Sequence, residues 1–225
     1  MNDEDRAELR RRFSGPTDPY LIPGTNCLRN KLGAIDIYTL HDSEAAHVGG
    51  RLYLLTLKPP TGDLEQNHVR AIHRSLFAGV YDWAGKYRDI SISKDGTDFA
   101  RPIDIAPTLK RICSRRFFDL QNTQHDRTAF ITNLTRFFND VNRIHPFREG
   151  NGRTQEFYFS LVVERFGRAL DWARVDKEQI DSASIAGTKG KTEQLRDIFE
   201  SAVQETSRKI PFARTIARPQ VEIER

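Results

Sequence analysis

A short polar segment between two strongly apolar stretches is the feature that most limits how this chain can fold. Before it, apolar side chains recur at helical spacing over about residues 127–143, namely Phe130, Leu134, Phe137, Phe138 and Val141. After it, residues 157–163 carry aromatic and aliphatic side chains on more than one face, as a helix buried on all sides requires. The intervening residues 145–153 must therefore form a loop that runs into the amino terminus of a buried helix.

Apolar spacing also predicts helices along most of the remaining chain. These expected helices cover about residues 64–80, 105–117, 177–184 and 193–207. We expect a charged helix or arm over residues 1–14. Residues 209–225 have little amphipathic pattern and are interpreted as a tail or linker.

Residues 87–104 interrupt this helical pattern. Apolar and polar side chains alternate within the stretch from Tyr87 to Ser93, as in a β-strand. The pair Asp95 and Gly96 favours a tight turn, and a second short strand is expected around Phe99. Two strands without a third partner are marginally stable alone, so the hairpin is expected to lie against a helical body. The sequence thus predicts a mainly α fold with one small β-hairpin.

Composition excludes several classes of protein. No apolar run reaches the ~18 residues of a membrane span, and the amino terminus lacks the apolar region of a secretory signal. Cys27 and Cys113 lie far apart, which argues against a disulfide scaffold or a structural zinc site. The net charge of +4 mixes 35 basic with 31 acidic residues and favours an ordinary surface over a nucleic-acid footprint. Composition alone indicates a soluble intracellular protein.

The loop over residues 145–153 carries the residue types of an anion site. Gly150 and Gly152 can adopt positive φ and let a ligand approach bare backbone N–H groups. At the start of a helix, these amides bind anions with the helix dipole behind them. Arg153 adds a forked cation that suits phosphate oxygens.

Two further residues of the loop suggest a reaction. A carboxylate at Glu149 beside an anion site requires a cation between them, and Mg²⁺ binds through one or two carboxylates plus phosphates. His145 precedes Pro146, which favours extended backbone, and its imidazole could accept a proton from a hydroxyl. Phe147 is expected to anchor the loop in the core. In the alternative interpretation, Glu149 forms a surface pair with Arg148 or Arg153 and the histidine is structural.

The loop resembles the signature of Fic proteins, His-x-Phe-x-Asp/Glu-Gly-Asn-Gly-Arg-x-x-Arg. The segment from Asp18 to Gly33 is similar to the opening of bacterial Fic chains, and Phe77 to Arg88 is similar to their segment before the hairpin. The resemblance implies a Fic-type helical bundle over residues 15–208, with a small β-hairpin flap (about 87–104) over an active-site loop (145–156).

The resemblance also implies an activity, the transfer of AMP from ATP to a hydroxyl side chain of a target protein. Carried over to this chain, His145 would be the general base and Glu149 would hold Mg²⁺. Asn151, with the backbone of Gly150 and Gly152, would hold the α-phosphate, and Arg153 would neutralise the leaving pyrophosphate.

The flap would dock the target by strand addition, a mode that relies on main-chain hydrogen bonds. The resemblance assigns this docking to Ile90, Ser91, Ile92, Ser93, Lys94, Gly96 and Phe99. The other histidines of the chain are given no role.

One residue departs from the signature, because its final arginine is replaced by Glu156. In the family that arginine contacts the γ-phosphate, and a pair of unit charges at 4 Å is worth about 4 kcal/mol at a dielectric of 20. Glu156 therefore predicts weakened ATP binding and attenuated activity. A non-catalytic binding module and a transferase with another phosphate-containing donor remain alternatives.

The resemblance leaves regulation and location as expectations. The family's inhibitory motif is incomplete at each of its three partial matches, so an inhibitory glutamate is expected on a separate small antitoxin protein. The expected location is the bacterial cytoplasm, with delivery into a host cell if the chain is part of an effector. Neither membrane nor nucleic-acid partners are expected.

Overall fold

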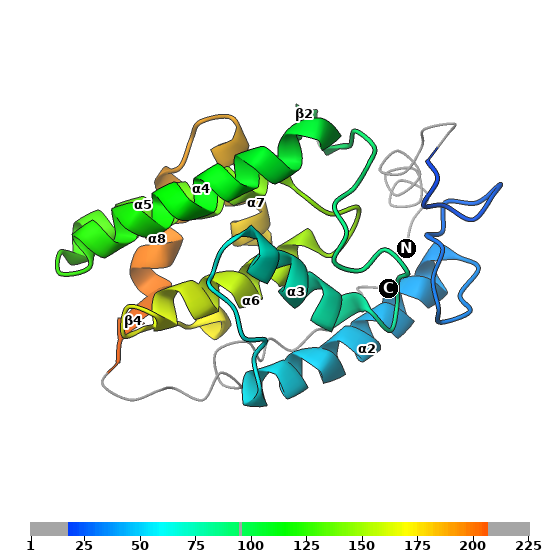
Figure 1. The fold of residues 1–225 in the computed structure, drawn as a ribbon, viewed down its shortest axis with the longest axis horizontal. Helices are drawn as coiled ribbons and strands as arrows, with labels where there is room; N and C mark the ends of the chain where they lie inside the picture. Colours follow the sequence, from blue (N-terminus) through cyan, green and yellow to red (C-terminus); the bar gives the residue numbers. More distant parts are fainter. Residues whose placement is uncertain (1–17, 95, 207–225) are drawn as a thin grey trace.

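The computed structural model describes residues 18–94 and 96–206, and most of them are helical (Figure 1). The charged arm expected over residues 1–14 and the tail over 209–225 lie outside these residues. The helices are α2 (Ile37–Leu57), α3 (Gln66–Phe77), α4 (Pro102–Thr123), α5 (Arg127–Ile144), α6 (Asn151–Glu164), the short η1 (Trp172–Arg174), α7 (Lys177–Thr188) and α8 (Glu193–Ala202). The strands are β1 (Ser93–Lys94), β2 (Thr97–Asp98), β3 (Arg168–Leu170) and β4 (Val203–Glu205).

Helix α6 forms the centre of the fold. In Figure 1 it runs through the middle of the molecule, and α3, α5 and β3 pack against it. Phe157, Tyr158 and Phe159 are all fully buried although they follow one another in sequence, so α6 is covered on several faces, as predicted. Each such side chain contributes roughly 1.5–3 kcal/mol through burial. The position of the loop before α6 is therefore fixed by the core.

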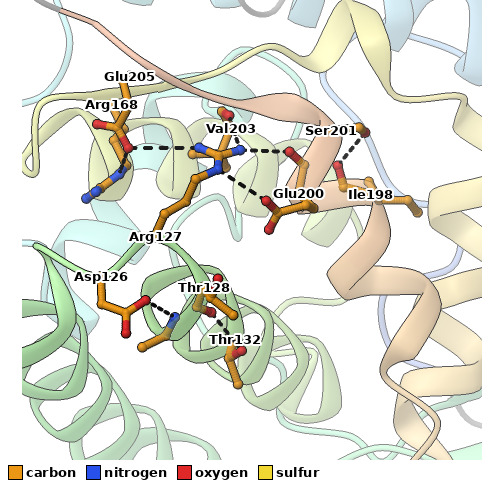
Figure 2. A network of polar contacts seen from close by, with 11 residues as sticks. Asp126, Arg127, Thr128, Thr132, Arg168, Ile198, Glu200, Ser201, Val203 and Glu205 are labelled. Atoms are coloured by element: carbon orange, nitrogen blue, oxygen red, sulfur yellow. Dashed lines mark hydrogen bonds and ion pairs between the residues drawn. The ribbon is translucent and has the colours of Figure 1, made fainter.

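The carboxyl-terminal elements hold the start of α5. Asp126 caps the helix by accepting a hydrogen bond from the N–H of Ala129 at 3.0 Å. Arg127 donates to the carbonyls of Glu200 at 2.8 Å and Val203 at 3.0 Å, and pairs with the Glu200 carboxylate (Figure 2). These contacts join the amino end of α5 to the end of α8 and to β4.

Two elements differ from the expected ones at the carboxyl end. The helix predicted over residues 193–207 ends at Ala202, because Val203 adopts extended backbone and β4 pairs antiparallel with β3, with Leu170 opposite Val203. Helix α7 continues to Thr188, beyond the predicted end at residue 184. The pairing of β3 with β4 joins segments distant in sequence, which spacing cannot reveal.

Helix α2 is not among the elements that spacing predicts. Asp36 caps it by accepting hydrogen bonds from Tyr38 and Thr39, each at 3.0 Å. It buries Leu40, Val48 and Leu55 but also exposes apolar side chains, so no single stripe marks it. Within the described part of the chain, neither α2 nor any other helix combines the length and apolar composition needed to cross a bilayer.

The predicted hairpin is present, with shorter strands than the alternation suggests. Ser93 pairs with Asp98 and Lys94 with Thr97, and Gly96 takes a positive φ of 73° in the turn. Beyond these residues the arms bind the helical body, since the N–H of Ala100 donates to the carbonyl of Arg143 at 3.3 Å. The flap is thus two short strands attached to the carboxyl end of α5.

Two helical glycines test how tightly the bundle is packed. A Cβ on Gly187 would lie 2.5 Å from Asn139 Oδ1 and 2.9 Å from Leu195 Cδ1, whereas one on Gly49 would meet no atom within 4 Å. Gly187→Ala is expected to lower the free energy of unfolding, because overpacking costs about 1–3 kcal/mol. Gly49→Ala is the matched control and should raise it by about 0.5–1 kcal/mol. Urea denaturation measures both, and equal gains for the two variants would contradict this packing.

Candidate active site

The glycines of the loop have different structural roles. Gly150 is the residue that caps α6, with a φ of +80°, and a Cβ there would lie 2.4 Å from the ring of Phe77. The site therefore requires glycine for both backbone and space. Gly152 does not take the positive φ that the sequence allows, because it lies within the first turn of α6. A Cβ on Gly152 would meet nothing within 4 Å, so the backbone there is open to a ligand.

Phe147 anchors the loop, as predicted. Its side chain is fully buried. Its N–H donates to Oδ1 of Asn151 at 2.9 Å, and its carbonyl accepts from Nδ2 of Asn151 at 2.8 Å. The amide of Asn151 is thus engaged with the backbone of its own loop, which differs from the direct phosphate contact that the family resemblance implies.

His73 is a site residue that the sequence analysis missed. Its ring stacks on that of Phe147 with centroids 3.8 Å apart. The N–H of Gly85 donates to Nδ1 at 2.8 Å, so Nε2 carries the proton and donates to the carbonyl of Glu149 at 3.0 Å. Burial lowers the pKa of His73 to about 4, which keeps this neutral tautomer at neutral pH. The sequence feature that could have identified His73 is its position beside Ile72 on the apolar face of the predicted helix.

His145 leaves α5 in the left-handed conformation, with φ of +49° and ψ of 66°. The extended backbone expected before Pro146 is therefore wrong. A following proline disfavours the right-handed helical region, and the chain turns out of α5 through the left-handed one, with the N–H of His145 still bonded to Val141 O at 3.2 Å. Burial lowers the pKa of the imidazole to about 4, so the ring is neutral at neutral pH.

The flap supplies one direct neighbour of this imidazole. The ring of Phe99 stacks on that of His145, with centroids 4.1 Å apart and an interplanar angle of 17°. Among the other flap residues named from the sequence, Ile90, Ile92 and Lys94 are half-buried, whereas Ser91, Ser93 and Gly96 are exposed. The structure thus brings Phe99 to the loop and leaves one face of the hairpin uncovered.

Arg153 lies between two carboxylates. It forms an ion pair with Glu44 of α2, a residue the sequence analysis did not single out, and its Nη2 lies 3.7 Å from Oε1 of Glu149. Tyr81 donates its hydroxyl hydrogen bond to Glu44, and the guanidinium lies over the ring of Phe77 at 4.9 Å. The phosphate-binding arginine expected from the sequence is therefore held in place by α2 and α3.

Glu149 is ionised in this setting. Burial raises the pKa of its carboxyl group. The charge of Arg153 and a hydrogen bond from the N–H of Gly150 at 2.8 Å are the largest of the effects that lower the pKa, and together these effects outweigh that of burial, so the pKa lies below its usual value. The side chain is 37% exposed and reaches the surface. Arg148 takes a different partner and donates to Oδ2 of Asp18 at 2.7 and 2.9 Å.

One of the amides predicted to bind phosphate has a partner within the loop. The N–H of Gly150 already donates to Glu149, so its predicted phosphate contact is not available in this arrangement. The N–H groups of Asn151, Gly152 and Arg153 belong to the first turn of α6, where no intrahelical acceptor exists. These three amides form the part of the helix end that can bind an anion.

Glu156 lies on the same face of α6 as Arg153. Residues three apart on a helix are neighbours on its surface, which places Glu156 next to Arg153. Glu149 precedes the helix and approaches Arg153 from the loop, with Oε1 3.7 Å from Nη2. The Glu156 side chain is half-buried. Arg153 therefore has one carboxylate before the helix, at Glu149, and another on the next turn, at Glu156.

The donor set fits magnesium better than a closed metal site. Within residues 18–94 and 96–206, no three histidine, cysteine or acidic side chains gather as metal ligands. A single ionised, surface-reaching carboxylate at Glu149 beside an anion site matches the way Mg²⁺ binds, through few carboxylates together with phosphate oxygens.

Comparisons with known proteins identify the family. The profile of the Fic/DOC family matches residues 63–163. The chain is 33% identical to the probable protein adenylyltransferase y4lH of Sinorhizobium fredii, over 80% of this chain and 92% of that protein. It is also 33% identical to the protein adenylyltransferase VbhT of Bartonella schoenbuchensis, of which it spans 41%.

A solved structure agrees with these sequence matches. The N-terminal Fic domain of a VirB-translocated Bep effector protein from Bartonella quintana, solved with bound ADP, superposes with a TM-score of 0.76. The identity is 26%, over 86% of this chain and 98% of that one. The fold is therefore the mainly α Fic fold that the loop resemblance implied, and this chain belongs to the Fic/DOC family.

Proposed function

We propose that this chain is a protein adenylyltransferase, which transfers AMP from ATP to a hydroxyl side chain of a target protein. The observation that carries the proposal is a neutral imidazole at His145 on the same loop as the uncapped amides of α6. Relatives that match most of this chain are named protein adenylyltransferases or probable ones. The transfer needs both features, a base for the hydroxyl and an anion site for the phosphates.

In the proposed reaction, His145 accepts a proton and the start of α6 binds the phosphates. Nδ1 of His145 is buried, which leaves Nε2 as the nitrogen that accepts the hydroxyl proton. The oxygen then attacks the α-phosphorus, and the bond from this phosphorus to the pyrophosphate oxygen breaks. The amides of Gly152 and Arg153 receive the phosphate oxygens, and the guanidinium of Arg153 balances charge on the departing pyrophosphate. Magnesium bound by Glu149 would neutralise further charge on the phosphates.

The flap is proposed to present the target. Its sheet has two strands, β1 paired with β2, so each strand has an outer edge with no third strand on it among the described residues, where an extended peptide can pair through main-chain hydrogen bonds. Phe99 places this edge next to His145. The geometry suits an acceptor hydroxyl on a loop or extended segment of the target.

The acidic residues around Arg153 favour reduced activity as part of the proposal. Glu44 pairs with Arg153, and Oε1 of Glu149 lies 3.7 Å from its Nη2. Glu156 follows one turn later on α6, so acidic residues gather beside the arginine proposed to bind phosphate. This same observation favours a second candidate, a Fic scaffold that binds its target without turnover. The Glu156→Arg variant below separates the two.

His145→Ala is expected to lower AMP transfer by about 10²–10⁴-fold, because the hydroxyl loses its base. Labelling of a bacterial lysate with α-³²P-ATP and Mg²⁺ measures transfer, and calorimetry should find the affinity for ATP unchanged. His125→Ala, an exposed histidine between α4 and α5, is the control and should label as the parent does. Full labelling by His145→Ala would contradict the assigned role.

Removal of Mg²⁺ should weaken ATP binding by tenfold or more, roughly the effect of one unpaired charge near the phosphates. Glu149→Gln keeps an oxygen for the Gly150 N–H but removes the charge, so its ATP affinity should respond little to EDTA. Glu193→Gln, an exposed acid at the start of α8, should keep the full response. An equal response to EDTA in all three proteins would exclude Glu149 as the ligand.

Glu156→Arg should strengthen ATP binding by about 10–100-fold, since a charge pair near a protein surface is worth roughly 1–4 kcal/mol. Glu164→Arg makes the same charge change at the far end of α6 and should have little effect. Labelling gained by Glu156→Arg supports an attenuated enzyme. Tight ATP binding without any labelling, even at high enzyme concentration, would favour the binding scaffold.

A further inference from the structure

Arg88 has an unusual set of hydrogen bonds. Its side chain is 2% exposed, and the guanidinium donates to four backbone carbonyls. The distances are 2.9 Å from Nε to His145 O, 3.1 Å from Nη2 to Ile144 O, 2.6 Å from Nη1 to Ile90 O and 2.5 Å from Nη2 to Ala100 O. The buried guanidinium of Arg88 thus binds carbonyl groups from three separate parts of the chain.

These carbonyls lie at the points where the flap meets the loop. Ile144 and His145 lie at the carboxyl end of α5. Carbonyls there have no donor within the helix and carry the negative end of the helix dipole. Ile90 and Ala100 lie on the two arms of the hairpin, one before β1 and one after β2. The backbone N–H of Arg88 also donates to the carbonyl of Pro146 at 3.0 Å.

The same contacts hold the backbone on which both rings of the stack are carried. Arg88 binds the carbonyl of His145 itself and the carbonyl of Ala100, the residue that follows Phe99. His145 is a non-glycine residue with positive φ, a conformation that persists only when neighbouring contacts hold it. The fork of the guanidinium, which directs its donors to several sides at once, cannot be reproduced by the single ammonium of lysine.

We propose that Arg88 is a positioning residue that couples the flap to His145, so that the hairpin and the imidazole keep one fixed arrangement. The proposal rests on the proposed function, because it concerns the distance between a target docked on the flap and the base that activates its hydroxyl. It assigns Arg88 no contact with ATP or the target.

The test compares Arg88→Lys with Arg168→Lys. Arg168 is also buried, donates to the carbonyl of Gln124 at 2.8 Å and lies in β3, so it controls for the loss of a buried guanidinium. Proton NMR of the His145 ring gives the first measurement, because stacking on Phe99 shifts its C–H signals upfield. The Phe99→Leu variant gives the reference chemical shifts of the His145 ring in the absence of stacking.

Arg88→Lys is expected to show the His145 shifts of Phe99→Leu, while Arg168→Lys keeps those of the parent. Trypsin cleavage after Lys94 at the flap tip should become at least about tenfold faster in Arg88→Lys alone, as expected when an anchored segment opens locally. AMP transfer should fall by about 100-fold, the cost of a misplaced catalytic group. Parental shifts and cleavage in a folded Arg88→Lys protein would overturn the proposal.

Hydrogen exchange of the parent protein covers the case in which Arg88→Lys does not fold. The amides of Ala100 and His145 donate to Arg143 and Val141, and a shared clamp predicts that both exchange at closely similar rates. Exchange of Ala100 at least about 100-fold faster than His145 would show a flap that opens independently and would overturn the coupling. Because neither NMR, proteolysis nor exchange requires transfer, a parent protein without AMP transfer would refute the proposed function separately.

Discussion

The contact between Gly150 and the ring of Phe77 is the constraint on which the site depends. It brings the start of α6 so close to the end of α3 that a single added carbon would collide at 2.4 Å. Because α6 is buried on several faces, this end cannot move away. The loop before it must then turn sharply, and Phe147, Asn151 and His73 fill the space beneath it with buried contacts. In the first turn of α6, Gly152 remains exposed, beside amides that have no intrahelical acceptor.

Each arginine beside this helix end is paired with a carboxylate. Arg153 is paired with Glu44 from α2 and lies near Glu149, while Arg148 is paired with Asp18 from the segment before α2. A site built in this way is pre-organised, since its arginine already has a defined position before any phosphate arrives. The same pairing lowers its attraction for polyphosphate, which is why the proposed activity includes a divalent cation at Glu149 and a reduced rate from Glu156.

Local pattern was sufficient for the parts of the molecule that depend on neighbouring residues. The apolar spacing predicts α5 and α6, the Asp95–Gly96 pair predicts the hairpin, and the apolar Phe147 among charged residues predicts the loop anchor. Helix α2 escaped because its apolar residues surround the helix, and the β3–β4 pair because it joins distant segments. His73, Glu44 and Arg88 each contact the loop or the start of α6 through a partner 57–109 residues away, which one sequence cannot reveal. The left-handed His145 was missed because the rule for residues before proline excludes one region without choosing between the others.

A crystal structure of the protein with a non-hydrolysable ATP analogue and Mg²⁺ tests the central claim most directly. The account predicts phosphate oxygens within hydrogen-bond distance of the N–H groups of Gly152 and Arg153, the α-phosphorus facing Nε2 of His145, and the terminal phosphate turned away from Glu156. Nucleotide bound elsewhere on the molecule, with the amino end of α6 covered by protein side chains, would contradict it.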